Sequence, residues 1–281
     1  MPCAPADGMH DPLKAAARAW LAAGRPAMVV QVLSTRGSVP RGAGTRMLVA
    51  ADVVTGTIGG GHLELQAIDR ARALLAGGLT APQDQAIALG PTLGQCCGGS
   101  LVLRTAPLDA SALAAWPDEP ALFSLQLHGA GHVGRAIVRL LHDLPCTVQW
   151  IDGRGSEFPA EPDPPHIARL CVDAAEAEVD NAPPGGFFLV LTHSHDLDLA
   201  ITQAILRRGD VGYLGLIGSA TKRARFTARL RQRGIDEDRL ARMTCPIGVP
   251  GIPGKQPAQI AVAVVAQLLQ VAAARSAVSP G

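Results

Sequence analysis

Two adjacent cysteines, Cys96 and Cys97, are the side chains best suited to reactive chemistry. They lie in a loop with glycine on both sides, LGQCCGG. An exposed thiolate is a nucleophile and binds soft metals or a persulfide sulfur. Two vicinal thiols cannot build a closed zinc site alone, and the chain offers no second pair. The loop therefore predicts a thiol that reacts or contacts a ligand; the alternative is one buried cysteine with an incidental neighbour.

Two histidines in the segment THSHDLD are the second candidates. If this segment ends a strand, His193 and His195 share one face and could contact a ligand or supply two metal ligands. The metallohydrolase pattern HxHxDH would need Asp and His where Leu197 and Asp198 stand. Asp196 could instead cap the helix that follows. We expect ligand contact here, with a metal or simple capping as alternatives.

A glycine motif, GAGHVG, follows an apolar segment and opens a helical one at Gly129–Gly134. Glycines at this spacing allow a tight turn, a close approach to pyrophosphate and helix-to-strand packing. Asp152 ends the next strand, where an acid that binds ribose belongs. His128 and His132 flank the motif and either contact a ligand or lie exposed in a loop. The motif predicts a Rossmann turn, and leaves open which nucleotide, if any, it holds.

Three more positions could hold an anion. Arg41 lies in a Gly/Pro loop, Ser219 opens an arginine-rich helix, and Lys255 precedes the last helix. Helix N-termini attract phosphate because their first N–H groups are unpaired. The segment GVPGIPGK is not a phosphate loop of the Walker type, since Val249 and Gln256 replace the required residues. The alternatives are a plain hairpin connection around Arg41 and a solvated charged face on the helix.

The elements that must position these residues fall into two domains, 1–118 and 119–281. The first alternates short strands with two helices and predicts a small α+β domain, closed by a Pro/Asp/Ala-rich linker near 107–120. After the linker, strands at 121–127, 146–152, 166–172, 187–194 and 211–219 alternate with helices, one after the glycine motif and others at 196–208, 219–232 and 257–274. This order predicts an α/β fold with a doubly wound, parallel, Rossmann-like sheet.

Composition excludes several classes of protein. Lys+Arg 25 against Asp+Glu 24 gives a net charge of +1, and aromatic residues are 3%. Neither a basic surface nor stacking platforms are therefore expected for nucleic acid. We see no run of about 18 apolar residues and no signal peptide, and so expect no membrane span. A cytoplasmic protein with free thiols is the expectation, rather than an exported one with three disulfides.

Eight segments together resemble one known family. They are STRGSVPRGAGTRMLV, GTIGGGHLE and GQCCGG in the first domain, and GAGHVGRAI, THSHDLD, YLGLIGSATKR, CPIG and GKQPAQIAVAV in the second. In this order and almost throughout the chain, they resemble the XdhC/CoxI family of xanthine dehydrogenase accessory proteins.

The resemblance implies a molybdenum cofactor (molybdopterin) chaperone rather than an enzyme. Such a protein binds the mature cofactor, supports its sulfuration by a cysteine desulfurase, and inserts it into apo xanthine dehydrogenase. Glycine turns would hold the phosphate, Cys96 or Cys97 would face the molybdenum, and a cleft between the domains is the expected site. The expected cofactor-binding residues are Cys96, Cys97, Gly59, Gly60, Gly61, Glu64, Arg41, Gly129, Gly131, Gly134, Asp152, His193, His195, Ser219 and Lys255.

Two other functions remain open at this point. An NAD(P)-dependent oxidoreductase would use the glycine motif with His193 or His195 as proton donor. A scaffold would dock the target enzyme without holding cofactor. A homodimer is a further alternative, because Ile260, Val264 and Leu268 could form an interface or belong to the core.

Overall fold

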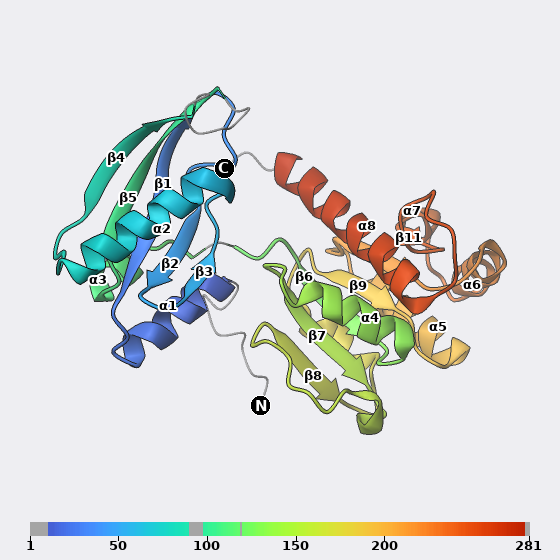
Figure 1. Cartoon of the computed structure of the whole chain (residues 1–281). Coiled ribbons are helices and arrows are strands. Elements are labelled where there is room, and N and C mark those ends of the chain that lie inside the picture. The colour runs from blue at the N-terminus through green and yellow to red at the C-terminus, as the bar shows by residue number, and fades with distance from the viewer. Residues whose placement is uncertain (1–10, 90–97, 119, 279–281) are drawn as a thin grey trace. The chain divides into compact units, whose positions relative to one another are not determined.

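The computed structural model describes residues 11–89, 98–118 and 120–278 (Figure 1). The chain divides into two compact units, with the boundary between Asp118 and Glu119. The glycine-flanked cysteines Cys96 and Cys97 lie outside the described residues.

The first unit is a five-stranded antiparallel sheet in the order β3-β2-β1-β5-β4. Alternate residues of β1 point to opposite faces. Met28 and Val30 pack under α2, whereas Ala27 and Val29 pack with Ala17 of α1. The elements are α1 (Pro12–Ala22), β1 (Ala27–Arg36), β2 (Arg46–Ala50), β3 (Val54–Gly56), α2 (Gly61–Ala76), β4 (Gln83–Ala88), β5 (Ser100–Pro107) and α3 (Ala110–Ala114).

Most of the expected linker is folded and belongs to the first unit. Asp109 caps α3 by accepting a hydrogen bond from the backbone of Ala112, and Trp116 is buried. The buried ammonium of Lys14 donates to the Trp116 carbonyl at 2.6 Å and to Asp118 at 2.5 Å. The linker prediction was therefore wrong for this stretch, because capping and burial outweigh its Pro/Asp/Ala composition.

The second unit is a six-stranded parallel sheet in the order β11-β10-β9-β6-β7-β8. The strand order reverses between β6 and β9, so the predicted doubly wound fold is confirmed. The elements are β6 (Ser124–His128), α4 (His132–Leu141), β7 (Thr147–Asp152), β8 (Ile167–Cys171), β9 (Phe187–Val190), α5 (His195–Arg207), β10 (Tyr213–Leu216), α6 (Ala220–Gln232), α7 (Glu237–Ala241), β11 (Met243–Thr244) and α8 (Pro257–Val278), with short 3₁₀ helices at Gly155–Glu157 and Ala177–Asn181.

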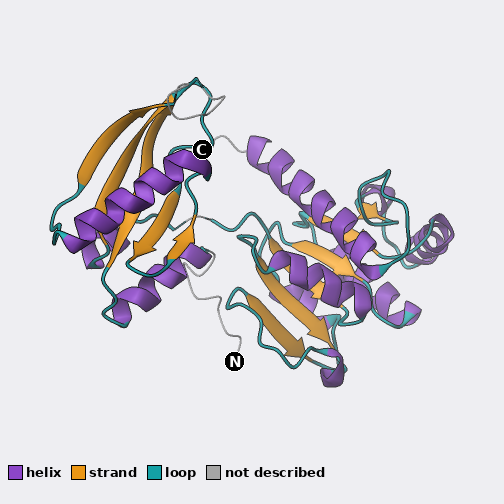
Figure 2. Cartoon of the chain, viewed as in Figure 1, coloured by secondary structure: helices purple, strands orange, loops and turns teal. Residues whose placement is uncertain are grey.

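Helices cover both faces of this sheet (Figure 2). On one face, Leu125 and Leu127 of β6 pack with Ile137 of α4 and with α8. On the other, Val190 of β9 packs with Ile201 of α5 and with α6. Burial on both faces explains why the strands are continuous apolar runs in the sequence.

By length and composition alone, the last helix could cross a membrane, a property that we expected of no segment. Pro257–Ala277 contains a window of mean hydropathy 1.6, long enough to cross a membrane, of which 33% is buried. This property of the helix was missed in the sequence because alanines and glutamines interrupt its large apolar residues. Val264 and Leu268 lie in the core and Ile260 packs against it, which is the role of a core helix.

Candidate functional site

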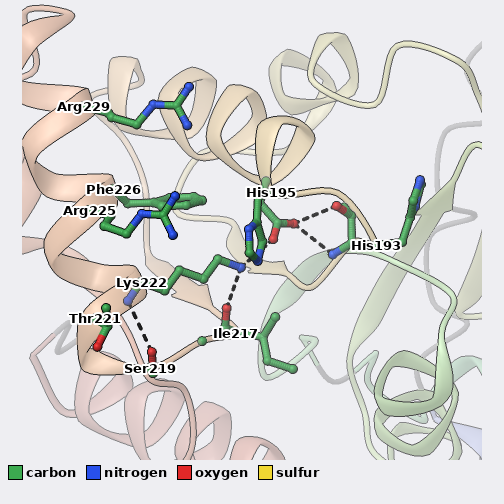
Figure 3. A pocket seen from close by; sticks show the side chains of 12 residues that line it. His193, His195, Ile217, Ser219, Thr221, Lys222, Arg225, Phe226 and Arg229 are labelled. Atoms are coloured by element: carbon green, nitrogen blue, oxygen red, sulfur yellow. Dashed lines mark hydrogen bonds and ion pairs between the residues drawn. The ribbon is translucent and has the colours of Figure 1, made fainter.

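A pocket of about 520 Å³ opens beyond the carboxyl ends of β9 and β10 in the second unit (Figure 3). In a doubly wound sheet, ligands bind at this edge. The lining comes from α5, α6 and the loops before them, and most of its residues are of polar or basic type, including Thr192, His193, His195, Asp198, Ser219, Lys222, Arg225 and Arg229.

Two serine caps shape the pocket. Ser194 caps α5 through the backbone N–H of Leu197, and Ser219 caps α6 through that of Lys222. β9 ends at Val190, so His193 lies in a loop and His195 is the first residue of α5. The prediction that both histidines share a strand face was therefore wrong, although both line the pocket.

No metal site was found at this pocket. Among the described residues, no three histidine, cysteine, aspartate or glutamate side chains gather closely enough to hold a metal ion. The capping role predicted for Asp196 is also wrong, since Ser194 is the N-cap and Asp196 lies within the first turn.

A buried ion pair forms one wall of the pocket. The carboxylate of Asp198 is 1% exposed and accepts a hydrogen bond from the Lys222 ammonium at 2.6 Å. Its other oxygen accepts hydrogen bonds from the backbone and hydroxyl of Thr192. Lys222 also donates to the Ile217 carbonyl at 2.9 Å. The pair thus joins α5, α6 and both loops and neutralises the carboxylate within the pocket.

The sequence interpreted the basic side chains of α6 mostly as a solvated face, but three of them line the pocket. Lys222, Arg225 and Arg229 extend from α6 toward α5, where His195 faces them (Figure 3). Their spacing of three, four and seven residues, which includes Phe226, places them on one helical face. That spacing was the available signal, but the many arginines of this helix resemble an ordinary solvated face.

The glycine motif after β6 is required by packing. Gly129 has a φ of +129°, and a Cβ there would lie 2.4 Å from the Leu191 carbonyl oxygen. A Cβ on Gly134 would lie 2.1 Å from the Gly129 carbonyl oxygen, whereas one on Gly131 would meet open space. The first and third glycines therefore serve the turn itself.

Asp152 holds this turn rather than standing free. It is 5% exposed, and one of its oxygens accepts a hydrogen bond from the backbone N–H of Ala130 at 2.7 Å. Arg154 donates to both oxygens. Burial raises the pKa of Asp152, but these hydrogen bonds outweigh it and lower that pKa overall. Ribose binding by Asp152 stays a prediction, and it would require this network to open.

His128, expected in an exposed loop or at a ligand, is fully buried at the end of β6. Neither ring nitrogen has a hydrogen-bond partner, and burial lowers the pKa of the ring to about 3. The expectation was wrong because the strand extends to this residue. His132, by contrast, is exposed at the start of α4.

In the first unit, three glycine-rich motifs lie against one another. A Cβ on Gly99 would lie 2.3 Å from the Ser38 carbonyl oxygen, and one on Gly59 would lie 2.4 Å from Pro40. The loop that carries Arg41 is therefore packed between GTIGGG and the glycines that follow Cys97. Only residues without a side chain fit at these two contacts.

Glu64 closes the GTIGGG loop. One carboxylate oxygen accepts hydrogen bonds from the Thr57 hydroxyl and from the backbone N–H groups of Ile58, at 2.9 Å, and Gly60, at 3.1 Å. Burial raises the pKa of Glu64, but these donors lower it overall. Glu64 thus shapes the loop, while Gly60 and Gly61 adopt positive φ. Lys255, in an exposed loop before α8, is absent from the lining of the pocket.

Both units match models of the same protein family. The model of the XdhC Rossmann domain matches residues 125–268, which is half of the chain, and that of the XdhC and CoxI family matches residues 20–83. The chain belongs to the XdhC/CoxI family. The resemblance seen in the sequence motifs is therefore confirmed.

Two similar proteins extend the comparison. Uncharacterized protein YqeB of Escherichia coli (strain K12) is 31% identical over 259 residues, covering 88% of this chain. The chain spans 43% of that relative's length. A crystal structure described as a xanthine dehydrogenase from Bacillus halodurans superposes with a TM-score of 0.76 at 20% identity, covering 95% of this chain and 98% of that one. The second likeness concerns the fold alone.

Proposed function

We propose that this XdhC/CoxI member binds the molybdenum cofactor, supports its sulfuration by a cysteine desulfurase, and passes it to apo xanthine dehydrogenase. The observation that carries the proposal is the packing of three motifs in the first unit. The Arg41 loop lies between GTIGGG and Gly99, two residues after Cys97. One edge of the unit thus combines a cation with glycine backbone, and the two thiols directly precede Gly98 in the sequence.

The residues at this edge suit molybdopterin. The guanidinium of Arg41 is exposed and has no ion pair among the described residues, so it is available to a phosphate. A Cβ on Gly60 or Gly98 would meet no atom of the described residues within 4 Å, which leaves this backbone open to a ligand. A thiolate of Cys96 or Cys97 is a soft ligand that suits molybdenum. When bound, the metal centre would be the group that receives sulfur.

The geometry favours this role over that of an NAD-dependent oxidoreductase. An NAD-dependent enzyme would need a free acid for the ribose, whereas both oxygens of Asp152 are engaged by Arg154 and Ala130. An accessory protein in the cytoplasm would also keep its thiols reduced and ready to react. A homodimer of this chain also stays a prediction, which the molar mass of the protein in solution would test.

The test is the cofactor content of the full chain purified from a molybdate-fed host. We expect molybdenum and pterin to copurify with wild type, and Cys96→Ala or Cys97→Ala to lower retention by roughly tenfold or more. Cys171→Ala is the matched control, because Cys171 is an exposed cysteine of the second unit. Retention equal to wild type in both single variants and the double variant would refute the role of the thiols.

A further inference from the structure

We infer that the pocket between α5 and α6 is a separate binding site for a phosphate group, with Arg225 as its main recognition residue. The ligand class is an organic phosphate such as a nucleotide. The site lies wholly within the second unit and shares no residue with the Arg41 and GTIGGG loops of the first unit. It would therefore stand even if the first unit held no cofactor.

The charges around the pocket do not cancel. Asp198 is neutralised by Lys222 at 2.6 Å, and Asp196 pairs with Arg229 at 3.3 Å. Arg225 lines the same pocket, is exposed, and has no hydrogen bond or ion pair within the described ranges. Among the described residues, no acidic side chain therefore balances the charge of Arg225.

Hydrogen-bond donors also remain unused in the pocket. The ammonium of Lys222 has three N–H groups, of which Asp198 and the Ile217 carbonyl engage two. The ring of His195 lies in the same space (Figure 3). Arg225 and Lys222 extend from α6 toward His195 on the opposite side (Figure 3). A ligand with several acceptor oxygens would satisfy these groups together.

The backbone adds to this preference for an anion. α5 and α6 both begin at the pocket, and each is 13 residues long. Unpaired N–H groups and the positive end of the helix dipole favour a negative group at such termini. Phosphate suits the site better than a carboxylate because it offers more acceptor oxygens to the forked guanidinium. The volume of about 520 Å³ leaves room for an organic group beyond the phosphate.

Calorimetric titration of the full chain, purified from molybdate-starved cells, tests the inference with inorganic phosphate, AMP and adenosine. We expect phosphate and AMP to bind and adenosine to give no heat. Arg225→Gln should weaken binding roughly ten- to hundredfold, the loss of one charge-assisted hydrogen-bonding group. Arg223→Gln is the matched control, because this exposed arginine of the same helix does not line the pocket, and its effect should stay within about twofold.

The outcomes separate the inference from the proposed function. AMP binding more tightly than phosphate would support a nucleotide as the source of the phosphate, and equal affinities would support recognition of the phosphate alone. No heat from wild type with either anion would overturn the inference, as would equal losses in the two arginine variants. Molybdopterin retention without phosphate binding would overturn the inference alone; phosphate binding without molybdopterin would overturn only the proposed function.

Discussion

Replacing His128 should remove a pH dependence from the stability of the second unit. The ring lies on the sheet face that also bears Ile151 and Val190, its register partners on β7 and β9. Both ring nitrogens are buried without a partner. A proton on this ring would place an unpaired charge in the core, which burial strongly disfavours.

The size of the effect follows from proton binding by the two states. Burial lowers the pKa of His128 from its ordinary value of 6.5 to about 3 in the folded chain. Below pH 6.5 the unfolded chain therefore takes up a proton that the folded chain does not, and stability falls as pH falls. Between about pH 7 and about pH 5 the free energy of unfolding should drop by about 2 kcal/mol.

Urea denaturation of the full chain at both pH values measures this loss. Hydrogen–deuterium exchange in peptides covering β6 and β9 reports the second unit specifically. His128→Leu should abolish most of the loss, because leucine does not titrate. His132→Gln is the control, since His132 is exposed four residues away, and it should keep the full loss. Asp152 and Glu64 have lowered pKa values, so both remain ionised over this range.

A wild-type loss below about 0.5 kcal/mol would contradict the reasoning, since the expected linkage is several times larger. The same conclusion would follow if His128→Leu kept the full pH dependence. Either result would mean that the ring reaches water or an acceptor in the folded chain.

Two further substitutions test the geometry of the second unit by calorimetric melting. Gly129→Ala should destabilise it by about 3 kcal/mol or more, because the new Cβ meets the Leu191 carbonyl at a positive φ, whereas Gly131→Ala should cost under about 1 kcal/mol. Equal costs would contradict the packing argument. Lys222→Met should cost about 3–5 kcal/mol by leaving the buried Asp198 carboxylate unpaired, and adding Asp198→Asn should recover part of it. A double variant as unstable as Lys222→Met would show that charge is not the cause.

The fold of the second unit was predictable because its strands are buried on both faces. Phe187–Val190 and Tyr213–Leu216 are uniformly apolar, so their place in a parallel sheet is visible in the sequence. Their ends were predicted too far along the chain. The polar loop after β9 is fixed by hydrogen bonds between Thr192 and Asp198, a contact that no local pattern reveals.

The site was less predictable because its key residues act through tertiary packing. Arg223 and Arg225 are two arginines of the same helix, and the sequence does not distinguish them. Only the position of α6 beside α5 decides which one lines the pocket. Asp152 has the spacing of a ribose-binding acid, yet Arg154, two residues later, engages it. The family motif GQCCGG identified the cysteine segment in the sequence. The roles of Cys96 and Cys97 stay predictions, because both lie outside the described residues.

Transfer of cofactor tests the central claim most directly. The full chain, loaded with molybdenum cofactor, would be mixed with apo xanthine dehydrogenase, and the enzyme activity gained would be compared with that from an equal amount of free cofactor. The account predicts faster and more complete activation by the loaded chain, and a loss of that advantage in the double Cys96→Ala, Cys97→Ala variant. Equal activation by free cofactor and by the loaded wild-type chain would contradict it.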